Sequence, residues 1–308
     1  MCMQKRLKYL LCAVLVSIAF LPGCRSARAD KASGTDVRVV RLRRAPEVGE
    51  KSDLPLVVWT ERRSEPRPLA ISVARLDLEC PDIQISAMVA DDPDGKGPAE
   101  AALTDPRELA KARGALVAVN ANAFSALPDE TGERPQGWRT GMPVDIAGLV
   151  VTGGDRLSGS YGHAGNDLCF WLSEKDRPHI GPLPGEYAPV REAVNAWWID
   201  LVKDGKILPR SGGDRHPRTA IGLDENRRWL FLVVVDGRQP GYSTGMTGRE
   251  LAELMLRLGA DRAINLDGGG SSIMLAHNPN GQLQIVNRPS GGKPRPIPVL
   301  LGVKSRRP

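Results

Sequence analysis

The sequence predicts a single α+β or α/β domain, in which helices pack on a mixed β-sheet containing a strand–helix–strand unit. Residues 229–235 are a nearly continuous apolar run, which is typical of a strand covered on both faces. Residues 247–259 have the spacing of an amphipathic helix, and residues 263–266 form a second short apolar run. A strand, a helix and a strand in this order favour two parallel strands joined by a right-handed crossover.

The amino terminus has the features of an export signal. A basic segment that ends at Lys8 precedes an apolar run over residues 9–20, which is too short to span a bilayer. The next four residues, Leu21-Pro22-Gly23-Cys24, resemble a bacterial lipobox. This resemblance implies that residues 1–23 are a signal peptide and that Cys24 is lipidated. The alternative is simple secretion, with cleavage near Ala27 or Ala29.

The mature protein is predicted to consist of a tether and one domain. Residues 24–52 are small, polar and charged, as expected of a flexible linker. The globular domain is expected to cover residues 53–308. We therefore expect an exported, membrane-anchored lipoprotein of the periplasm or the cell surface.

Composition narrows the expected partners. The 308 residues include 42 basic and 36 acidic ones, and three of the basic residues belong to the signal peptide. A bias this weak, without a clustered basic stripe, predicts no nucleic-acid partner. Outside the signal peptide and Cys24, the cysteines are Cys80 and Cys169, which pair or stay reduced. No spacing requires a cofactor or a metal, although paired aspartates beside a phosphate could hold Mg²⁺ or Ca²⁺.

The first half of the domain is predicted to be rich in strands, with one short helix. Residues 104–108 open that helix with a capping residue and a proline in the first turn, and Gly114 ends it. Asp204 and Gly205 mark a hairpin. Alternating, β-branched or apolar segments predict strands at residues 37–42, 56–60, 69–78, 83–89, 116–119, 146–152 and 169–172.

The predicted helix in the second half has clear boundaries. Thr247 and Glu250 form a capping box at its start, and Gly259 ends it. Its apolar stripe consists of Leu251, Leu254, Met255 and Leu258.

Two aspartates follow the apolar strands at either end of this helix. Asp236 and Asp267 would lie together at the carboxyl ends of parallel strands, where open α/β sheets bind ligands. Gly268, Gly269 and Gly270 follow directly, and a glycine run lets backbone N–H groups approach an anion. We expect one pocket that contains both carboxylates beneath the glycine amides.

Basic and polar residues nearby suit a sugar phosphate. The guanidinium group of arginine is a planar fork that matches two phosphate oxygens. Asn122 follows a predicted strand and could bind sugar hydroxyls. The candidate substrate-binding residues are Asn122, His216, Arg218, Thr219, Arg238, Gly268, Gly269, Gly270 and Ser271.

Five segments together resemble the phosphodiester glycosidase family over about residues 110–303. The resemblance implies hydrolysis of the glycosidic bond of sugar 1-phosphodiesters, and we expect a cell-envelope or exopolysaccharide glycan as substrate. The family often has glycine at the position of Ala123. The segments are Asn122–Phe124, Arg218–Gly222, Asp236–Arg238, Thr247–Gly259 and Asn265–Ser272.

This activity predicts a role for each group. Glycoside cleavage passes through an oxocarbenium-like transition state that a carboxylate pair serves, so Asp267 and Asp236 are the candidate catalytic residues. Arg218 and the glycine amides would hold the phosphate, with help from Ser271 and Arg238.

Two other function classes remain open. Gly241–Gly245 matches the G-x-S-x-G pattern, and Ser243, Asp267 and His277 follow the residue order of an α/β-hydrolase triad. The motif does not lie directly between a strand and a helix, which weighs against a serine hydrolase. A non-catalytic protein could also use the same crevice to bind anionic glycans.

Overall fold

The computed structural model describes residues 40–41, 54–95, 97–158, 168–185, 189–197 and 199–306. The predicted signal peptide, the lipidation of Cys24 and nearly all of the predicted tether lie outside the described residues. Among the described residues, no helix is both long and apolar enough to cross a membrane.

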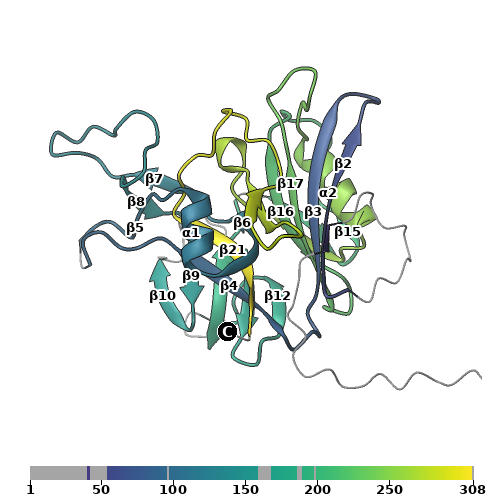
Figure 1. Cartoon of the computed structure of the whole chain (residues 1–308), viewed down its shortest axis with the longest axis horizontal. Coiled ribbons are helices and arrows are strands. Elements are labelled where there is room, and N and C mark those ends of the chain that lie inside the picture. Colours follow the sequence, from purple (N-terminus) through teal and green to yellow (C-terminus); the bar gives the residue numbers. More distant parts are fainter. Residues whose placement is uncertain are drawn as a thin grey trace, which may run out of the picture. The chain divides into compact units, whose positions relative to one another are not determined.

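The largest sheet of the described residues has eight strands, and it contains Arg218 and Thr219 of the predicted site in β16 (Figure 1). Its strand order is β1-β2-β3-β17-β16-β18-β14-β15, and every pair except β1–β2 is antiparallel. Its strands are β1 (Val40–Arg41), β2 (Leu56–Arg63), β3 (Leu69–Asp77), β14 (Asp200–Lys203), β15 (Lys206–Ile207), β16 (Arg218–Leu223), β17 (Trp229–Val235) and β18 (Arg262–Asn265).

Three smaller antiparallel sheets complete the described part. A five-stranded sheet, in the order β20-β19-β6-β21-β4, packs against the eight-stranded sheet through one large apolar core. The other two have the orders β10-β9-β13-β11-β12 and β5-β8-β7. Their strands are β4 (Ile83–Val89), β5 (Ala101–Ala102), β6 (Ala115–Asn120), β7 (Phe124–Ala126), β8 (Pro143–Ile146), β9 (Val150–Thr152), β10 (Asp155–Ser158), β11 (Cys169–Ser173), β12 (Pro178–Gly181), β13 (Val190–Asn195), β19 (Met274–His277), β20 (Leu283–Ile285) and β21 (Val299–Ser305).

The predicted α+β or α/β fold class is wrong, because the protein is built mostly of antiparallel β-sheets. The described residues contain only two α-helices, α1 (Pro106–Ala112) and α2 (Gly248–Arg257). Strands β17 and β18 do run in the same direction, because each is antiparallel to β16. Since β16 lies between them, they are not the neighbouring pair that the strand–helix–strand pattern predicted.

The burial of β17 explains this error. Leu232 belongs to the core shared with the five-stranded sheet, whereas the next residue, Val233, belongs to a core shared with α2. Successive side chains of a strand point to opposite faces, so β17 is apolar throughout because both faces are covered. A continuous apolar run therefore indicated burial on two sides correctly, but it contains no information about the direction of the neighbouring strands.

Helix α2 has the predicted cap and the predicted buried stripe. The Thr247 hydroxyl accepts a bond from the Glu250 N–H at 3.2 Å, and the Glu250 carboxylate accepts one from the Thr247 N–H at 2.9 Å. The helix packs closely on β16 at Gly222, where a Cβ atom would lie 2.6 Å from Met255 Cε and 2.9 Å from Ala260 Cβ. Glycine is thus required here by the contact between helix and sheet.

Cys80 and Cys169 are not joined by a disulfide in the structure. The Cys169 thiol donates instead to Asn195 Oδ1 at 3.2 Å. Of the two states that the sequence left open for these thiols, the structure has the reduced one.

We expect Gly222→Ala to lower the melting temperature of the protein. The added methyl group would overlap Met255 and Ala260, and overpacking of this kind costs about 1–3 kcal/mol. For a domain of this size, each kcal/mol corresponds to roughly 2–4 °C. Thermal unfolding followed by circular dichroism measures the change. Gly185→Ala is the control, because a Cβ atom at Gly185 meets no other atom within 4 Å; equal shifts in the two variants would contradict the packing argument.

Candidate active site

Three strands of the eight-stranded sheet bring the predicted site residues to one end of that sheet. Arg218, the first residue of β16, pairs with the last residue of β17. The last residue of β18 pairs with Ala220, which is also near the start of β16. Asp236 directly follows β17 and Asp267 lies just after β18, so these two residues and Arg218 occupy the same end.

The loop that contains the three glycines crosses from the eight-stranded sheet to the five-stranded sheet, and Asn120 at the end of β6 holds it. Asn120 Nδ2 donates to the Asp267 carbonyl at 2.6 Å, while its Oδ1 accepts the Ile273 N–H at 3.1 Å. The same Oδ1 accepts the Thr219 hydroxyl at 2.7 Å. Thr219 is fully buried, so its hydroxyl helps to position this loop and does not reach a ligand.

The glycines give space to neighbouring groups of the protein. A Cβ atom at Gly268 would lie 2.8 Å from the Pro217 carbonyl oxygen, and one at Gly270 would overlap the guanidinium group of Arg295. Gly269 has a φ of +61°, in the left-handed region that favours glycine. Each position therefore has its own structural reason to be glycine.

The amides of this loop are less available to an anion than the sequence suggested. The Gly268 N–H donates to Asp267 Oδ1 at 2.9 Å, and the Gly269 N–H donates to the Pro217 carbonyl at 2.9 Å. Both amides are thus engaged within the protein. Among the described residues, Gly270 is the one of the three predicted donors whose N–H has no hydrogen-bond acceptor.

Three arginines surround this end of the sheet: Arg218, Arg238 and Arg295. Among the described residues, none of them has a carboxylate within ion-pair distance. Arg218 is anchored by carbonyl oxygens, because its Nε donates to Met246 at 3.0 Å and its Nη2 to Asp214 at 3.2 Å. Burial, with the neighbouring charge of Arg238, lowers the pKa of Arg218. An anionic ligand would relieve this unbalanced positive charge.

Arg238 and His216 form a second pair of donors. Arg238 Nη2 donates to His216 Nδ1 at 3.2 Å, because a guanidinium group has no acceptor. Burial lowers the pKa of His216, and the charges of Arg238 and Arg218 lower it further. His216 is therefore neutral near pH 7, with its proton on Nε2. Arg238 itself has a φ of +58°, a strained conformation for a residue with a side chain.

Asp267 combines partial exposure with a shifted acidity. Burial raises the pKa of the Asp267 carboxyl to about 6, although the Ser271 hydroxyl, the Arg295 charge and the Gly268 N–H oppose the increase. Ser271 is buried, and its hydroxyl accepts a bond from Arg295 at 3.3 Å. A carboxyl group with this pKa changes its protonation close to neutral pH, which suits proton transfer or nucleophilic attack.

Asp236 has a different environment, because its carboxylate is 3% exposed and saturated with hydrogen bonds. Oδ1 accepts Asn287 Nδ2 at 2.8 Å, and Oδ2 accepts the Arg288 N–H at 3.0 Å and the Tyr242 hydroxyl at 3.1 Å. Burial raises the pKa of Asp236, whereas these bonds lower it. The carboxylate connects the segment after β17 to residues 287–288.

Asn122 does not offer its amide to a sugar. Its Nδ2 donates to the carbonyls of Ala147 at 3.0 Å and Leu149 at 3.2 Å, and its Oδ1 accepts the Asn195 N–H at 3.3 Å. The residue is 2% exposed and braces the surrounding loops. The asparagine that contacts the glycine loop is Asn120, two residues earlier.

The serine-hydrolase alternative conflicts with the structure. Ser243 is fully buried, and its hydroxyl donates to the Asp236 carbonyl at 2.5 Å and accepts the Ala70 N–H at 3.1 Å. His277 lies in β19 of the other sheet. Ser243 is therefore a structural residue and cannot act as a nucleophile in this conformation.

Sequence reasoning missed Arg295, Asn120 and Asn287. Arg295 comes from the long segment between β20 and β21, where no helical or strand periodicity marks it. Asn120 was visible as part of an Asn-Ala-Asn sequence after a strand, but the prediction chose Asn122, two residues later. No sequence pattern marks Asn287, because its role depends on its hydrogen bond to Asp236, which is 51 positions away.

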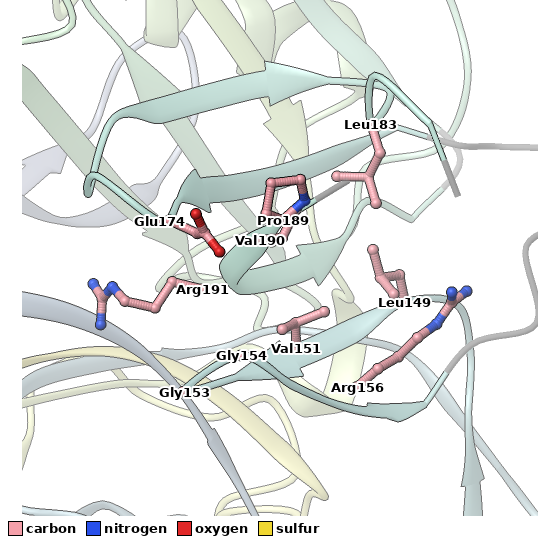
Figure 2. Close-up of a pocket in the computed structure, with 10 residues that line it drawn as sticks. All are labelled: Leu149, Val151, Gly153, Gly154, Arg156, Glu174, Leu183, Pro189, Val190 and Arg191. Atoms are coloured by element: carbon pink, nitrogen blue, oxygen red, sulfur yellow. The ribbon is translucent and has the colours of Figure 1, made fainter. Parts of the chain in front are cut away.

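A separate pocket lies away from the cluster around Asp267. This pocket of about 600 Å³ lies on the sheet that contains β9 and β13, and it is lined by Leu149, Val151, Leu183 and Val190 with Arg156 and Glu174 among its polar groups (Figure 2). None of its lining residues belongs to the cluster around Asp267. No group of three His, Cys, Asp or Glu side chains in the described part could hold a metal ion.

Two solved structures share this fold. The first is the catalytic domain of zebrafish N-acetylglucosamine-1-phosphodiester alpha-N-acetylglucosaminidase, auto-inhibited by its pro-peptide, with a TM-score of 0.59 and 21% identity over 85% of this chain and 87% of that chain. The second is a putative exported protein from Burkholderia pseudomallei, with a TM-score of 0.52 and 16% identity over 77% of this chain and 74% of that chain.

Sequence comparisons point the same way. The chain is 29% identical to the SPbeta prophage-derived uncharacterized protein YomE of Bacillus subtilis over 178 residues, which are 53% of this chain. The match spans only 24% of that longer relative. The family model for phosphodiester glycosidase matches residues 113–304, well over half of the chain. This chain therefore belongs to the phosphodiester glycosidase family, which consists of hydrolases that act on phosphodiester glycosidic bonds.

Proposed function

We propose that this protein hydrolyses the bond between the anomeric carbon and the phosphate oxygen in sugar 1-phosphodiesters of cell-envelope or exopolysaccharide glycans. One observation carries the proposal: the partly exposed carboxyl of Asp267, with a pKa of about 6, lies beside arginines that form no ion pair among the described residues. The arginines suit the phosphodiester, and the carboxylate suits the anomeric centre.

In this mechanism the electrons of the broken bond move to the phosphate oxygen. Arg218 and Arg238 stabilise that charge, and the neutral His216 donates a hydrogen bond from Nε2. The leaving group is a phosphate monoester that carries two negative charges, and it is a weak enough base to leave without strong protonation. Asp267 therefore acts in its ionised form on the oxocarbenium-like centre, as a nucleophile or as the base that activates water.

We assign Asp236 a positioning role within this mechanism. The carboxylate already has three hydrogen-bond partners and almost no exposure. Two residues later, Arg238 points its guanidinium toward Gly269, where a Cβ atom would lie 3.3 Å from Nη1. Asp236 thus fixes the segment that presents Arg238.

The Asp267→Asn variant is expected to lose at least about 10²-fold in kcat, which is the lower end of acid–base contributions. The measurement is the release of free sugar from a panel of sugar 1-phosphodiesters. Asp204→Asn is the matched control and should retain full turnover. Asp204 is exposed in the turn between β14 and β15, at the end of the eight-stranded sheet opposite Asp267. Full turnover by Asp267→Asn would disprove the assignment, and a protein that binds the glycans without releasing sugar would be a binding protein.

The pH dependence of kcat/KM provides a separate test of Asp267. Because burial raises its pKa to about 6 and the ionised form is active, kcat/KM should rise with pH, be half-maximal at about pH 6 and level off above about pH 7. Asp236→Asn should lower kcat/KM through the position of Arg238 but keep the same acidic limb. If Asp236→Asn lost the rise of kcat/KM with pH, the positioning role of Asp236 would be contradicted. If the midpoint of that rise stayed at the same pH in Asp267→Glu, the role of Asp267 would be contradicted.

We further propose that the protein is an exported lipoprotein, on the basis of its lipobox-like Cys24 and basic, apolar amino terminus. The Cys24→Ala variant is expected to lose incorporation of labelled palmitate and to move from the membrane fraction to the soluble fraction. Unchanged membrane association without lipid would indicate another anchor.

A further inference from the structure

We propose that Arg62, Tyr242 and Arg288 form a second anion subsite beside the active site, which selects substrates with a negative charge beyond the reacting phosphodiester. We call these three residues the rim cluster. The inference rests on the proposed function and narrows its substrate class to glycans with more than one anionic group.

The rim cluster is built around a fixed tyrosine. The Tyr242 hydroxyl donates to Asp236 Oδ2 at 3.1 Å and accepts a bond from Arg62 Nη2 at 3.2 Å. The guanidinium carbons of Arg62 and Arg288 lie 4.7 Å and 4.9 Å from the centre of the tyrosine ring. Both arginines are exposed, whereas their anchor Asp236 is buried. The structure thus holds two accessible guanidinium groups around one ring.

The rim cluster shares a support with the active site. Asp236 accepts the Arg288 N–H, and the Gln239 side chain donates to the Arg288 carbonyl at 2.9 Å. Gln239 directly follows Arg238, whose guanidinium lies at the glycine loop. Residues 236–242 therefore carry both Arg238, which binds the reacting phosphodiester, and Tyr242 of the rim cluster. One extended substrate could contact both.

A count of charges supports a second anionic group. Arg62 and Arg288 add two guanidinium groups to Arg218, Arg238 and Arg295, and among the described residues none of these five arginines forms an ion pair with a carboxylate. A phosphodiester adds one negative charge, which still leaves a positive excess. Protonation of Asp267 near pH 6 increases that excess. A phosphate or carboxylate elsewhere on the substrate would balance it.

The geometry suits phosphate in particular. Arg62 has used one donor on the Tyr242 hydroxyl, and its other N–H groups stay available. A guanidinium group can bind two phosphate oxygens at once, and a cluster fixed in advance loses little conformational entropy on binding. Among the described residues, neither rim arginine forms an ion pair that would have to break first.

The experiment compares two substrates on the full chain. One is a propyl phosphodiester of N-acetylglucosamine 1-phosphate, and the other is the same compound with a terminal phosphate on the propyl group. We expect a higher kcat/KM for the second substrate, and this preference should fall as NaCl screens the charges. Arg62→Gln and Arg288→Gln should each reduce the preference about threefold to tenfold.

Arg228→Gln is the matched control for this test. Arg228 is also an exposed arginine over an aromatic ring, at 5.0 Å from Trp229, but it lies at the opposite end of β17. It should leave the preference unchanged. Hydrolysis of both substrates at equal kcat/KM, with no effect of the rim variants, would overturn the subsite and leave the proposed function intact.

Two further outcomes would also count against the subsite. Hydrolysis of neither substrate, nor of any sugar 1-phosphodiester in the panel, would overturn the proposed function together with the subsite. If Arg62→Gln and Arg288→Gln weaken binding to phosphatidylglycerol vesicles but keep the substrate preference, the rim cluster is a membrane contact and the substrate proposal is wrong.

Discussion

The site depends on the hydrogen bonds of one buried asparagine. Asn120 contacts the Asp267 carbonyl, the Ile273 N–H and the Thr219 hydroxyl, and so joins β6, β16 and the loop between the two large sheets. A buried amide that lost any of these partners would leave polar atoms unsatisfied, at a cost of about 1–3 kcal/mol each. The position of the Asp267 carboxylate is therefore set by the packing of one sheet against the other.

Electrostatics explain why this end of the sheet is suited to an anion. Guanidinium groups surround Asp267, and neutral acceptors hold them in place. Arg218 donates to backbone carbonyls, and Arg238 donates to a neutral histidine. These contacts fix the arginines without neutralising them. Asp236 differs from Asp267, since its carboxylate is buried and accepts three hydrogen bonds. Two aspartates in similar sequence positions consequently have different environments.

Several parts of this arrangement were predictable from the residues. The capping box at Thr247 and Glu250, the helix start at Asp105 and the burial of β17 on both faces all depend on neighbours close in sequence. The resemblance also identified the family correctly. The predicted fold class was wrong because the strand–helix–strand order predicted two neighbouring parallel strands, whereas β16 lies between β17 and β18 and runs in the opposite direction. Strand direction depends on the path of the chain, which apolar periodicity does not encode.

By itself, the sequence determined the local chemistry. It placed Asp267 and three glycines after β18, Arg218 at the start of β16 and Arg238 after β17. It also indicated the residues that cap both helices. Only the tertiary structure decided which aspartate stays accessible, which asparagine holds the loop and which arginines surround Asp267. The physical reason is that hydrogen-bond saturation and burial are set by groups from distant segments. Asn287 and the Arg288 N–H occupy Asp236, while Arg295 approaches Asp267 through the space left by Gly270.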